Sequence, residues 1–315
     1  MREGLLPATV ATVLELSTSG EQARALTELL GEIFDPTETA ISAFEVADGI
    51  TTLSMNIPWK VEIYFANPPD EDAVRDLLRP IVGELVDNTP FTTVNTKDWV
   101  ANSLDGLKPV RAGRVLVHGA HDRHVVRTND VAIEIEAALA FGTGHHGTTA
   151  GCLLALDAEL KKRRPRHGID IGTGTGILGL ALAKQIKRKV VAGDIDAVAV
   201  EVSAHNARLN HAPNALDLYV APGLRHAKAW RPGHFDFVFA NILAGPLKRL
   251  APSIARVLSS DGTLILSGLL AMDVAGVASA YRHQGVYLAS HSLREGWATL
   301  VMKKGGAAPR PRRLA

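Results

Sequence analysis

Glycines and acidic residues stand at the ends of two apolar stretches in the middle of the chain. The first stretch, in GIDIGTGTGILGLALAK, ends in Asp170 and leads into Gly172, Gly174 and a further glycine, followed by an amphipathic helix pattern. The second, VVAGDID, carries Asp194, which follows Gly172 by 22 residues. A strand, a glycine turn and a helix start form a nucleotide-binding corner, and an acid at this spacing accepts hydrogen bonds from a ribose. We therefore predict that an adenosine-containing cofactor is bound by Asp170, Gly172, Gly174 and Asp194.

The spacing of the glycines separates the candidate cofactors. A dinucleotide fold usually carries G-x-G-x-x-G, whose third glycine lets the helix pack closely beside the pyrophosphate site, whereas here the run is G-x-G-x-G followed by Ile177. A carboxylate at Asp170 would repel a pyrophosphate and would suit a cofactor with an ammonium and a sulfonium group. We therefore expect S-adenosylmethionine rather than a nicotinamide cofactor, which disfavours an oxidoreductase. A plain flexible turn would leave both acids unexplained.

The composition describes a globular chain without a strong overall charge. Its 315 residues suggest about two domains, and its formal charge of +1 means that any nucleic-acid-binding surface must be local. The single cysteine, Cys152, excludes an internal disulfide, suits a reducing compartment and is expected to be buried. No apolar run approaches the roughly 20 residues that cross a bilayer. We expect a cytoplasmic protein without membrane contact.

Residues 1–97 are expected to form a small domain of their own. The segments TVATVLEL, AISAFEVA, WKVEIYFAN and FTTVNTK read as strands. They alternate with two helices, the first opened by a Ser19–Gln22 capping box and the second capped by Asp70 and interrupted at Pro80. The order βαββαβ predicts a ferredoxin-like α+β domain. Because its residues indicate no chemistry, we assign it a role in binding or structure.

The rest of the chain divides into three parts. Residues 98–130 are predicted to be a linker and the start of β segments, residues 131–304 an α/β domain, and residues 305–315 a disordered tail. Seven apolar segments in the α/β domain read as strands, and the last two are close together without a long helix between them. We expect a seven-stranded doubly wound sheet that ends in an antiparallel hairpin.

Five runs in this part of the chain carry a family resemblance: AFGTGHHGTT, DIGTGTGIL, GDIDAVAVEVSAHNARLN, FDFVFANILAGPLKRLAP and GTLILSGLL. In this order they resemble the PrmA-type methyltransferases of the large-subunit ribosomal protein L11. The resemblance covers roughly two thirds of the chain. It implies a class I, Rossmann-like, S-adenosylmethionine-dependent methyltransferase domain behind a substrate-recognition domain. It also implies methylation of lysine side chains, and of the N-terminal α-amine, of that ribosomal protein.

Site residues follow from the resemblance position by position. It implies that Thr149, Gly172, Asp194 and Asn241 bind the cofactor, with Thr143 as a further candidate in the loop before Thr149. Thr149 stands near a helix start, where a hydroxyl and backbone N–H groups can hold a carboxylate. Asn241 ends a buried strand, at the edge where open α/β sheets bind ligands. The structural alternatives are a simple helix cap and a turn residue.

Methyl transfer from a sulfonium is an in-line displacement, which needs geometry more than acid–base groups. We take Asn241 as the residue that orients the amine and Phe141 as a wall of the transfer channel. Ile242 and Leu243 do not supply the Pro-Pro-aromatic clamp that holds a planar amide or base. The N-terminal residues match the family only in architecture. The alternatives are therefore another protein or a small amine as substrate and, more remotely, a non-catalytic cofactor-binding assembly factor.

Histidines and a basic run complete the candidates. His118, His121 and His124 are expected to be solvated loop residues, and His145 is expected to contact the cofactor region or cap its loop. A metal site would need three or four converging ligands, usually with cysteine support, so no metal is expected. The run KKRRPRH (161–167) could make a weak contact with ribosomal RNA or be a solvated link between helix and strand.

Overall fold

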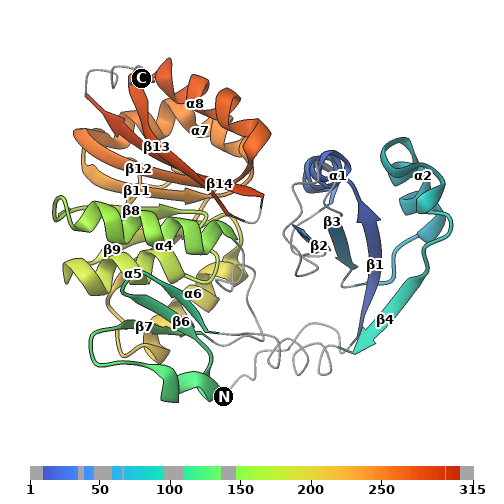
Figure 1. The fold of residues 1–315 in the computed structure, drawn as a ribbon, viewed down its shortest axis with the longest axis horizontal. Coiled ribbons are helices and arrows are strands. Elements are labelled where there is room, and N and C mark those ends of the chain that lie inside the picture. Colours follow the sequence, from blue (N-terminus) through green and yellow to red (C-terminus); the bar gives the residue numbers. More distant parts are fainter. Residues whose placement is uncertain are drawn as a thin grey trace, which may run out of the picture. The chain divides into compact units, whose positions relative to one another are not determined.

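The protein is described by a computed structural model that covers residues 10–34, 39–45, 59–65, 67–95, 109–135, 147–294 and 296–305 (Figure 1). The chain separates into two compact units, Met1–Ser103 and Leu104–Ala315. Within the described ranges, none of the helices is long and apolar enough to cross a membrane. The described residues of the N-terminal unit form one sheet, and those of the C-terminal unit form two, of seven and three strands.

The N-terminal unit is a four-stranded antiparallel sheet with two helices. Its strands are arranged in the order β2-β3-β1-β4, and every neighbouring pair is antiparallel. This arrangement confirms the predicted ferredoxin-like βαββαβ unit. The elements are β1 (Val10–Thr18), α1 (Gly20–Ile33), β2 (Thr39–Glu45), β3 (Trp59–Phe65), α2 (Glu71–Val82), the 3-10 turn η1 (Gly83–Leu85) and β4 (Phe91–Asn95).

Alternating side chains give this sheet one apolar face. Along β3 every second residue from Trp59 to Phe65 is buried, as expected for a strand packed on one side only. The Ser19–Gln22 capping box of α1 is confirmed, with the Gln22 N–H donating to Ser19 Oγ over 3.2 Å. The interruption predicted at Pro80 is wrong, because α2 continues to Val82. Pro80 stands close to the helix end, where the buried Leu78 and Val82 hold the last turn against the core.

The C-terminal unit contains a seven-stranded sheet in the order β10-β9-β8-β11-β12-β14-β13 (Figure 1). The first five strands in this order are parallel, and β14 is antiparallel to both β12 and β13. The predicted doubly wound sheet and its antiparallel hairpin are thus confirmed. The strands are β8 (Gly168–Ile171), β9 (Val190–Asp194), β10 (Leu216–Val220), β11 (Phe235–Asn241), β12 (Leu258–Leu270), β13 (Val286–Arg294) and β14 (Trp297–Lys304).

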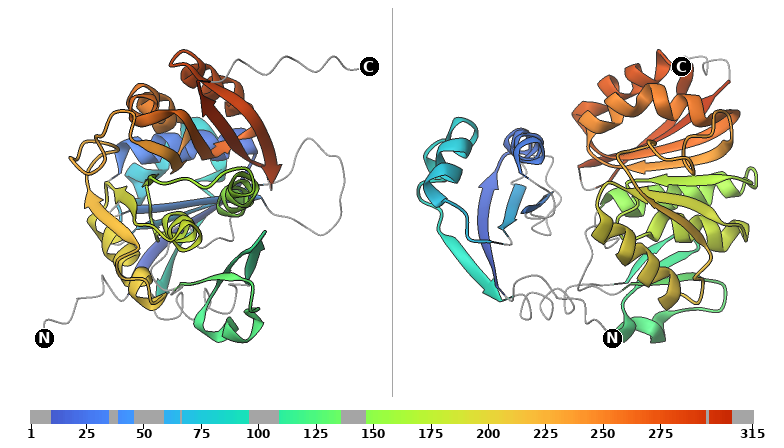
Figure 2. Two further views of the ribbon diagram at one scale, coloured as in Figure 1. Left: turned by 90° about the vertical axis from the view of Figure 1, so that its left-hand side faces the viewer. Right: turned by 180° about the vertical axis from the view of Figure 1, so that it is seen from behind.

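Helices cover both faces of this sheet (Figure 2). Phe237 and Phe239 of β11 point into one core, which they share with α4, α5 and the C-terminal part of α6. Val238 and Ala240 point into the other core, which they share with α7 and α8. This alternation buries β11 on both faces, as is typical of a central parallel strand. The helices are α4 (Gly147–Leu160), α5 (Ile177–Ile186), α6 (Ala197–Leu209), α7 (Ala244–Val257), α8 (Val274–Arg282) and the 3-10 turn η4 (Ala271–Asp273).

A three-stranded sheet extends the core of the C-terminal unit. It consists of β5 (Val110–Ala112), β6 (Val115–His118) and β7 (Val131–Glu134), with the 3-10 helix η2 (Ala120–Val125) between the last two. Its apolar side chains share a core with α4 and α5, including the buried Cys152, which was expected to be buried. The described part of the segment 98–130, for which the sequence predicts a linker and the start of β segments, therefore packs within this unit.

Candidate active site

Three neighbouring parallel strands bring the candidate residues to one edge of the seven-stranded sheet (Figure 1). Ile171 of β8 lies opposite Gly193 of β9 and Ala240 of β11. The residues at the carboxyl ends of these strands therefore lie side by side, and they include Gly172, Asp194 and Asn241. The carboxyl edge of a parallel sheet is where α/β proteins bind their ligands. The topology thus assembles residues that are far apart in the sequence.

The glycine turn after β8 adopts a backbone conformation that side chains disfavour. Gly172, Gly174 and Gly176 all have positive φ angles, of 71°, 52° and 82°, in the left-handed region that glycine enters without cost. A Cβ atom on Gly172 would lie 2.3 Å from Cγ2 of Ile242. The Gly172 and Thr173 N–H groups both donate to the Gly193 carbonyl, at 2.9 and 3.0 Å. The turn is therefore anchored to β9 and leaves its backbone bare toward the sheet edge.

Asp194 is oriented by backbone donors on both of its carboxylate oxygens. Oδ2 accepts from the Gly174 N–H at 2.9 Å, and Oδ1 accepts from the Asp196 N–H at 3.2 Å. The side chain remains half-buried at the end of β9. Each carboxylate oxygen can accept a second hydrogen bond. Asp194 is thus held in place with acceptor capacity left for the two hydroxyls of a ribose.

Asp170 is buried beneath the glycine turn. Its Oδ2 accepts from Thr173 Oγ1 and from the Gly179 N–H, both at 2.9 Å. Its Oδ1 is buried and accepts no hydrogen bond from the described residues. Burial, and to a smaller extent the Asp194 carboxylate, raises the pKa of this carboxyl to about 6, against the two hydrogen bonds that lower it. A buried acceptor without a donor is costly, and an ammonium-bearing ligand would satisfy it.

The first turn of α4 meets the end of β11. Asn241 Nδ2 donates to Thr148 Oγ1 at 3.5 Å, and Thr148 and Thr149 are both buried. Thr149 is therefore placed in the first turn of a helix, as predicted, whereas the residue that contacts Asn241 is its neighbour. No described residue bonds to Asn241 Oδ1. This oxygen remains available at the sheet edge as an acceptor for an amine.

Two glycines let α4 lie close against the β13–β14 hairpin. A Cβ on Gly147 would lie 2.4 Å from the Arg294 carbonyl oxygen, and a Cβ on Gly151 would lie 2.2 Å from Thr299 Oγ1. Side chains at either position would push the helix away. The close packing fixes Thr148 and Thr149 relative to the sheet edge.

Three residues that the sequence analysis did not assign to the cofactor site belong to this edge. Thr148 contacts Asn241, Ile242 fills the space below Gly172, and Ile195 directly follows Asp194 with its side chain 61% exposed. An exposed large apolar side chain beside an acid that is predicted to bind a ribose suits the face of an adenine ring. The sequence signal that could have indicated Ile195 is its position as an apolar residue directly after the acid of VVAGDID. Thr148 carried only the weaker signal of a paired threonine.

The remaining sequence candidates are histidines and residues of the segment before α4. Phe141, Thr143 and His145 are outside the described residues. His118 is buried, with Nδ1 2.9 Å from the Gly119 carbonyl oxygen, so its expected solvated position is wrong. His118 is the last residue of β6, a strand that packs into the core. His121 and His124 are exposed in η2, as expected. No group of three or more metal-binding side chains occurs among the residues that the structure describes.

Comparisons with known proteins agree on one family. The family model of ribosomal protein L11 methyltransferase (PrmA) matches residues 14–305. The chain is 46% identical over 285 residues to a ribosomal protein L11 methyltransferase of Bradyrhizobium diazoefficiens, covering 90% of this chain and 94% of the relative. It is 45% identical over 285 residues to one of Rhodopseudomonas palustris, covering 90% and 93%. The solved ribosomal protein L11 methylase of Lactobacillus delbrueckii subsp. bulgaricus aligns with a TM-score of 0.57 at 26% identity, covering 63% of this chain and 100% of that one.

Proposed function

The chain belongs to the ribosomal protein L11 methyltransferase (PrmA) family, and we propose that it methylates amino groups of ribosomal protein L11 at the edge formed by β8, β9 and β11. The family is S-adenosylmethionine-dependent, and this chain is an S-adenosylmethionine-dependent methyltransferase. The observation that carries the assignment of the site is the buried Oδ1 of Asp170 below the glycine turn, which accepts no hydrogen bond from the residues that the structure describes.

The residues at this edge fit S-adenosylmethionine part by part. Asp170 offers a buried negative charge to its ammonium group, and Asp194 offers acceptors to its ribose. Gly172 and Gly174 let the backbone approach closely, and Thr149 stands in the first turn of α4, where free N–H groups favour a carboxylate. The cofactor supplies an electrophilic methyl group on a positively charged sulfur. We assign Thr143, outside the described residues, to the same site.

Asn241 is the residue that we assign to the amine. Its Oδ1 can accept a hydrogen bond from an amine N–H, while the contact of Nδ2 with Thr148 limits rotation of the amide. An orienting acceptor of this kind acts through geometry, which is what an in-line displacement requires. A lysine or α-amine must be neutral to attack, and the partly buried edge favours the neutral form. We keep Phe141, outside the described residues, as the wall of the transfer channel.

The N-terminal unit supplies the proposed substrate-recognition surface. The face of its sheet that carries Lys60, Glu62 and Tyr64 is polar, and Lys60 bridges Glu15 and Glu62 at 2.8 and 3.0 Å. Tyr64 donates to Glu62 at 2.5 Å. These interactions place ordered charged and aromatic groups on one strand, which suits a protein partner better than a small amine. We also propose that residues 1–97 recognise the substrate. Lysine side chains and the α-amine of that substrate accept the methyl groups, and the reaction takes place in the cytoplasm.

Intact-mass analysis tests the proposal directly. Purified ribosomal protein L11 is incubated with this protein and S-adenosylmethionine, and the expected result is a mass gain in whole methylene steps, with peptide mapping to assign the amines. If calorimetry shows cofactor binding but L11 gains no mass, the substrate assignment is overturned and another protein or a small amine takes its place. If every protein substrate tested stays unmodified while the cofactor binds, a non-catalytic assembly factor is favoured. Without cofactor binding, the assigned site is wrong.

A further inference from the structure

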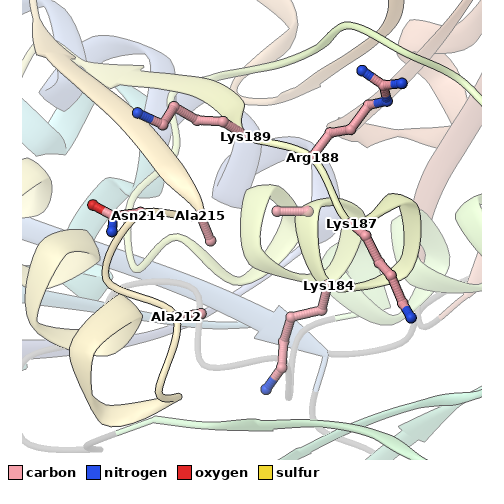
Figure 3. A pocket seen from close by; sticks show the side chains of 8 residues that line it. Lys184, Lys187, Arg188, Lys189, Ala212, Asn214 and Ala215 are labelled. Atoms are coloured by element: carbon pink, nitrogen blue, oxygen red, sulfur yellow. The ribbon is translucent and has the colours of Figure 1, made fainter.

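A basic surface pocket lies at the amino edge of the same sheet, opposite the candidate active site in strand direction. It has a volume of about 360 Å³ and is formed where the end of α5 meets the turn before β10 (Figure 3). The Val190 N–H at the start of β9 donates to the Ala215 carbonyl at 2.9 Å, which joins the two segments. Four of its eight lining residues are cationic and none is acidic: Ala183, Lys184, Lys187, Arg188, Lys189, Ala212, Asn214 and Ala215.

One of the four cations serves the fold. Lys184 Nζ donates to the Ala132 carbonyl at 2.6 Å and to Asn210 Oδ1 at 3.3 Å, so it connects α5 with β7 and α6. Burial lowers its pKa. The other three, Lys187, Arg188 and Lys189, are exposed and form no ion pair with the described carboxylates. Their charge is therefore available to a ligand.

Two further exposed cations come from the basic run before β8. Arg164 Nη2 donates to the Gln185 carbonyl at 2.8 Å, which places Arg164 beside the end of α5. Arg166 is exposed, and its side chain forms no ion pair among the described residues. The other Lys and Arg side chains of the run have carboxylate partners. Lys161 and Arg163 pair with Asp157 and Asp261, both at 2.7 Å. Lys162 pairs at 2.6 Å with Glu159, which also pairs with Lys303. Because β8 and β9 are parallel neighbours, both basic segments reach the same edge.

The backbone at Lys187 points to a role for its side chain. Lys187 follows the last residue of α5 in a left-handed conformation, with φ at 56°, and its N–H caps the Ala183 carbonyl. Glycine is the usual residue at such a position, because it avoids the steric cost of a Cβ atom. The fold alone would be served better by glycine. A lysine here adds a positive charge at the rim of the pocket in spite of that cost.

We infer that Lys187, Arg188, Lys189, Arg164 and Arg166 form a docking surface for the phosphate backbone of RNA. Exposed cations whose side chains form no ion pair among the described residues release counterions when they contact a polyphosphate, and Asp236, which accepts from the Arg166 backbone N–H at 2.8 Å, is the one carboxylate beside this surface that the hydrogen bonds show. The pocket lining holds no aromatic side chain for a base and, besides the cations and Asn214, only alanines, so it suits a backbone rather than a sequence and lacks groups to insert into a bilayer. The carbonyl end of α5 also disfavours one deeply bound phosphate.

The proposal complements the methyltransferase function without depending on it. The docking surface lies at the amino ends of β8 and β9, and the cofactor residues lie at their carboxyl ends. RNA bound at the amino edge therefore leaves the candidate active site open. A protein that modifies a ribosomal component would gain residence time near its substrate from such a contact, in addition to any recognition by the N-terminal unit.

Fluorescence anisotropy with a short fluorescein-labelled RNA hairpin tests the surface on the full chain. The variant Lys187→Gln/Arg188→Gln should weaken RNA binding about 10-fold and reduce the slope of log Kd against log salt by about 1.5, as expected for two lost phosphate contacts. The matched control, Lys161→Gln/Lys162→Gln, removes the same charge where carboxylates already neutralise it, and should change Kd less than about 2-fold. Lys187→Gly removes one charge while relieving the left-handed backbone, so it should weaken RNA binding while the free energy of unfolding, measured by chemical denaturation, does not fall.

Several outcomes would overturn the inference. The first is that the unchanged protein shows no saturable RNA binding, and the second is that the variant and its control lose the same RNA affinity. The third is that inorganic phosphate displaces the RNA when its concentration equals that of the RNA phosphates, which would indicate a small-anion pocket. Binding to mixed phosphatidylserine–phosphatidylcholine vesicles that is as tight as binding to the RNA would indicate a membrane surface instead. S-adenosylmethionine binding, measured on the same variants by calorimetry, should stay unchanged. A failure of methyl transfer to L11 would leave the RNA result standing, so the two proposals fail separately.

Discussion

The two edges of the seven-stranded sheet use charge in opposite ways. At the carboxyl edge, Asp170 and Asp194 are fixed by backbone donors, and one buried carboxylate oxygen of Asp170 has no hydrogen-bond partner within the described part of the chain. At the amino edge, Lys187, Arg188 and Lys189 are exposed to solvent. Buried groups have strong and specific hydrogen-bonding requirements, whereas exposed charges act additively and are screened by salt. A single substitution should therefore be decisive at the carboxyl edge and graded at the amino edge.

The largest effect is expected from Asp194→Ala. This change removes the acceptors that we propose for two ribose hydroxyls and leaves the Gly174 N–H without the carboxylate to which it donates. Because hydrogen bonds to a charged group contribute about 1.5–3 kcal/mol each, S-adenosylmethionine should bind at least about 100-fold more weakly. Isothermal titration calorimetry measures this directly. Asp217→Ala is the control, since Asp217 lies on the neighbouring strand β10 and pairs with Lys228 at 2.8 Å, away from the edge. Equal losses in both variants would contradict the assigned ribose site.

Asn241→Ala should separate the chemical step from cofactor binding. The Asn241 amide is held by Thr148 and presents Oδ1 to the amine, so its removal should lower kcat about 100-fold, as loss of one positioned polar group does in other enzymes. Cofactor affinity, measured by calorimetry, should be largely retained. Thr148→Val keeps the side-chain shape but removes the acceptor that fixes the amide, and an intermediate decrease of kcat is expected. An unchanged kcat in Asn241→Ala would remove this residue from the proposed mechanism.

A pH profile tests the buried carboxylate. Asp170 has a pKa of about 6, above the usual 3.8. Its negative charge, which attracts the cofactor's ammonium group, is therefore lost as the pH falls through 6. Cofactor affinity should decrease about 10-fold between pH 7.5 and pH 5, because each pH unit below the pKa costs up to about 1.4 kcal/mol. Asp170→Asn should bind weakly and with a flat profile between these values. A profile that stays steep in Asp170→Asn would assign the titration to another group.

The same shift has a consequence of defined sign for stability. Because the pKa of Asp170 is higher in the folded than in the unfolded chain, folding favours the protonated carboxyl. The contribution of this group to the free energy of unfolding is fully present below about pH 4 and is lost as the pH rises through 6. Without cofactor, Asp170→Asn should therefore gain stability relative to the unchanged protein as the pH is raised from 4 to 7. Urea unfolding at both pH values measures the difference.

Local patterns made much of the carboxyl edge predictable. The strand, glycine turn and acid of 168–194 depend on residues close in sequence, and a turn that needs positive φ at three positions requires the glycines that are found there. The Thr148–Asn241 contact joins residues 93 positions apart, so it depended on the packing of α4 against β11. Asp170 Oδ1 is buried and accepts no hydrogen bond from the described residues. This too is a property of the packed interior, because exposure and hydrogen bonding are set only once the core has formed.

The amino edge and the three-stranded sheet were less predictable for a related reason. The basic run 161–167 was visible in the sequence, but only the structure separates Lys161 and Lys162, which have carboxylate partners, from Arg164 and Arg166. Short strands such as β5 and β6 carry little periodicity, so the sequence predicts a linker and the start of β segments over 98–130 but not the packing of these strands with α4 in one core. The buried position of His118 follows from the same packing. Long-range contacts, rather than local propensity, decided each of these cases.

The smallest effect is expected where the amino edge trades stability for charge. Lys187→Gly should raise the free energy of unfolding by up to about 1 kcal/mol, because glycine removes the cost of a side chain in the left-handed region. Lys189→Gly is the matched control: it removes the same charge at a residue without positive φ, beside the start of β9, and should lower stability by about 0.5–1 kcal/mol. Chemical denaturation of the two variants gives the comparison. Changes of opposite sign in the free energy of unfolding would show that the lysine at 187 is retained against the preference of the backbone. A loss of stability in both variants would show that the Lys187 side chain supports the fold and would weaken the case for an RNA-docking role.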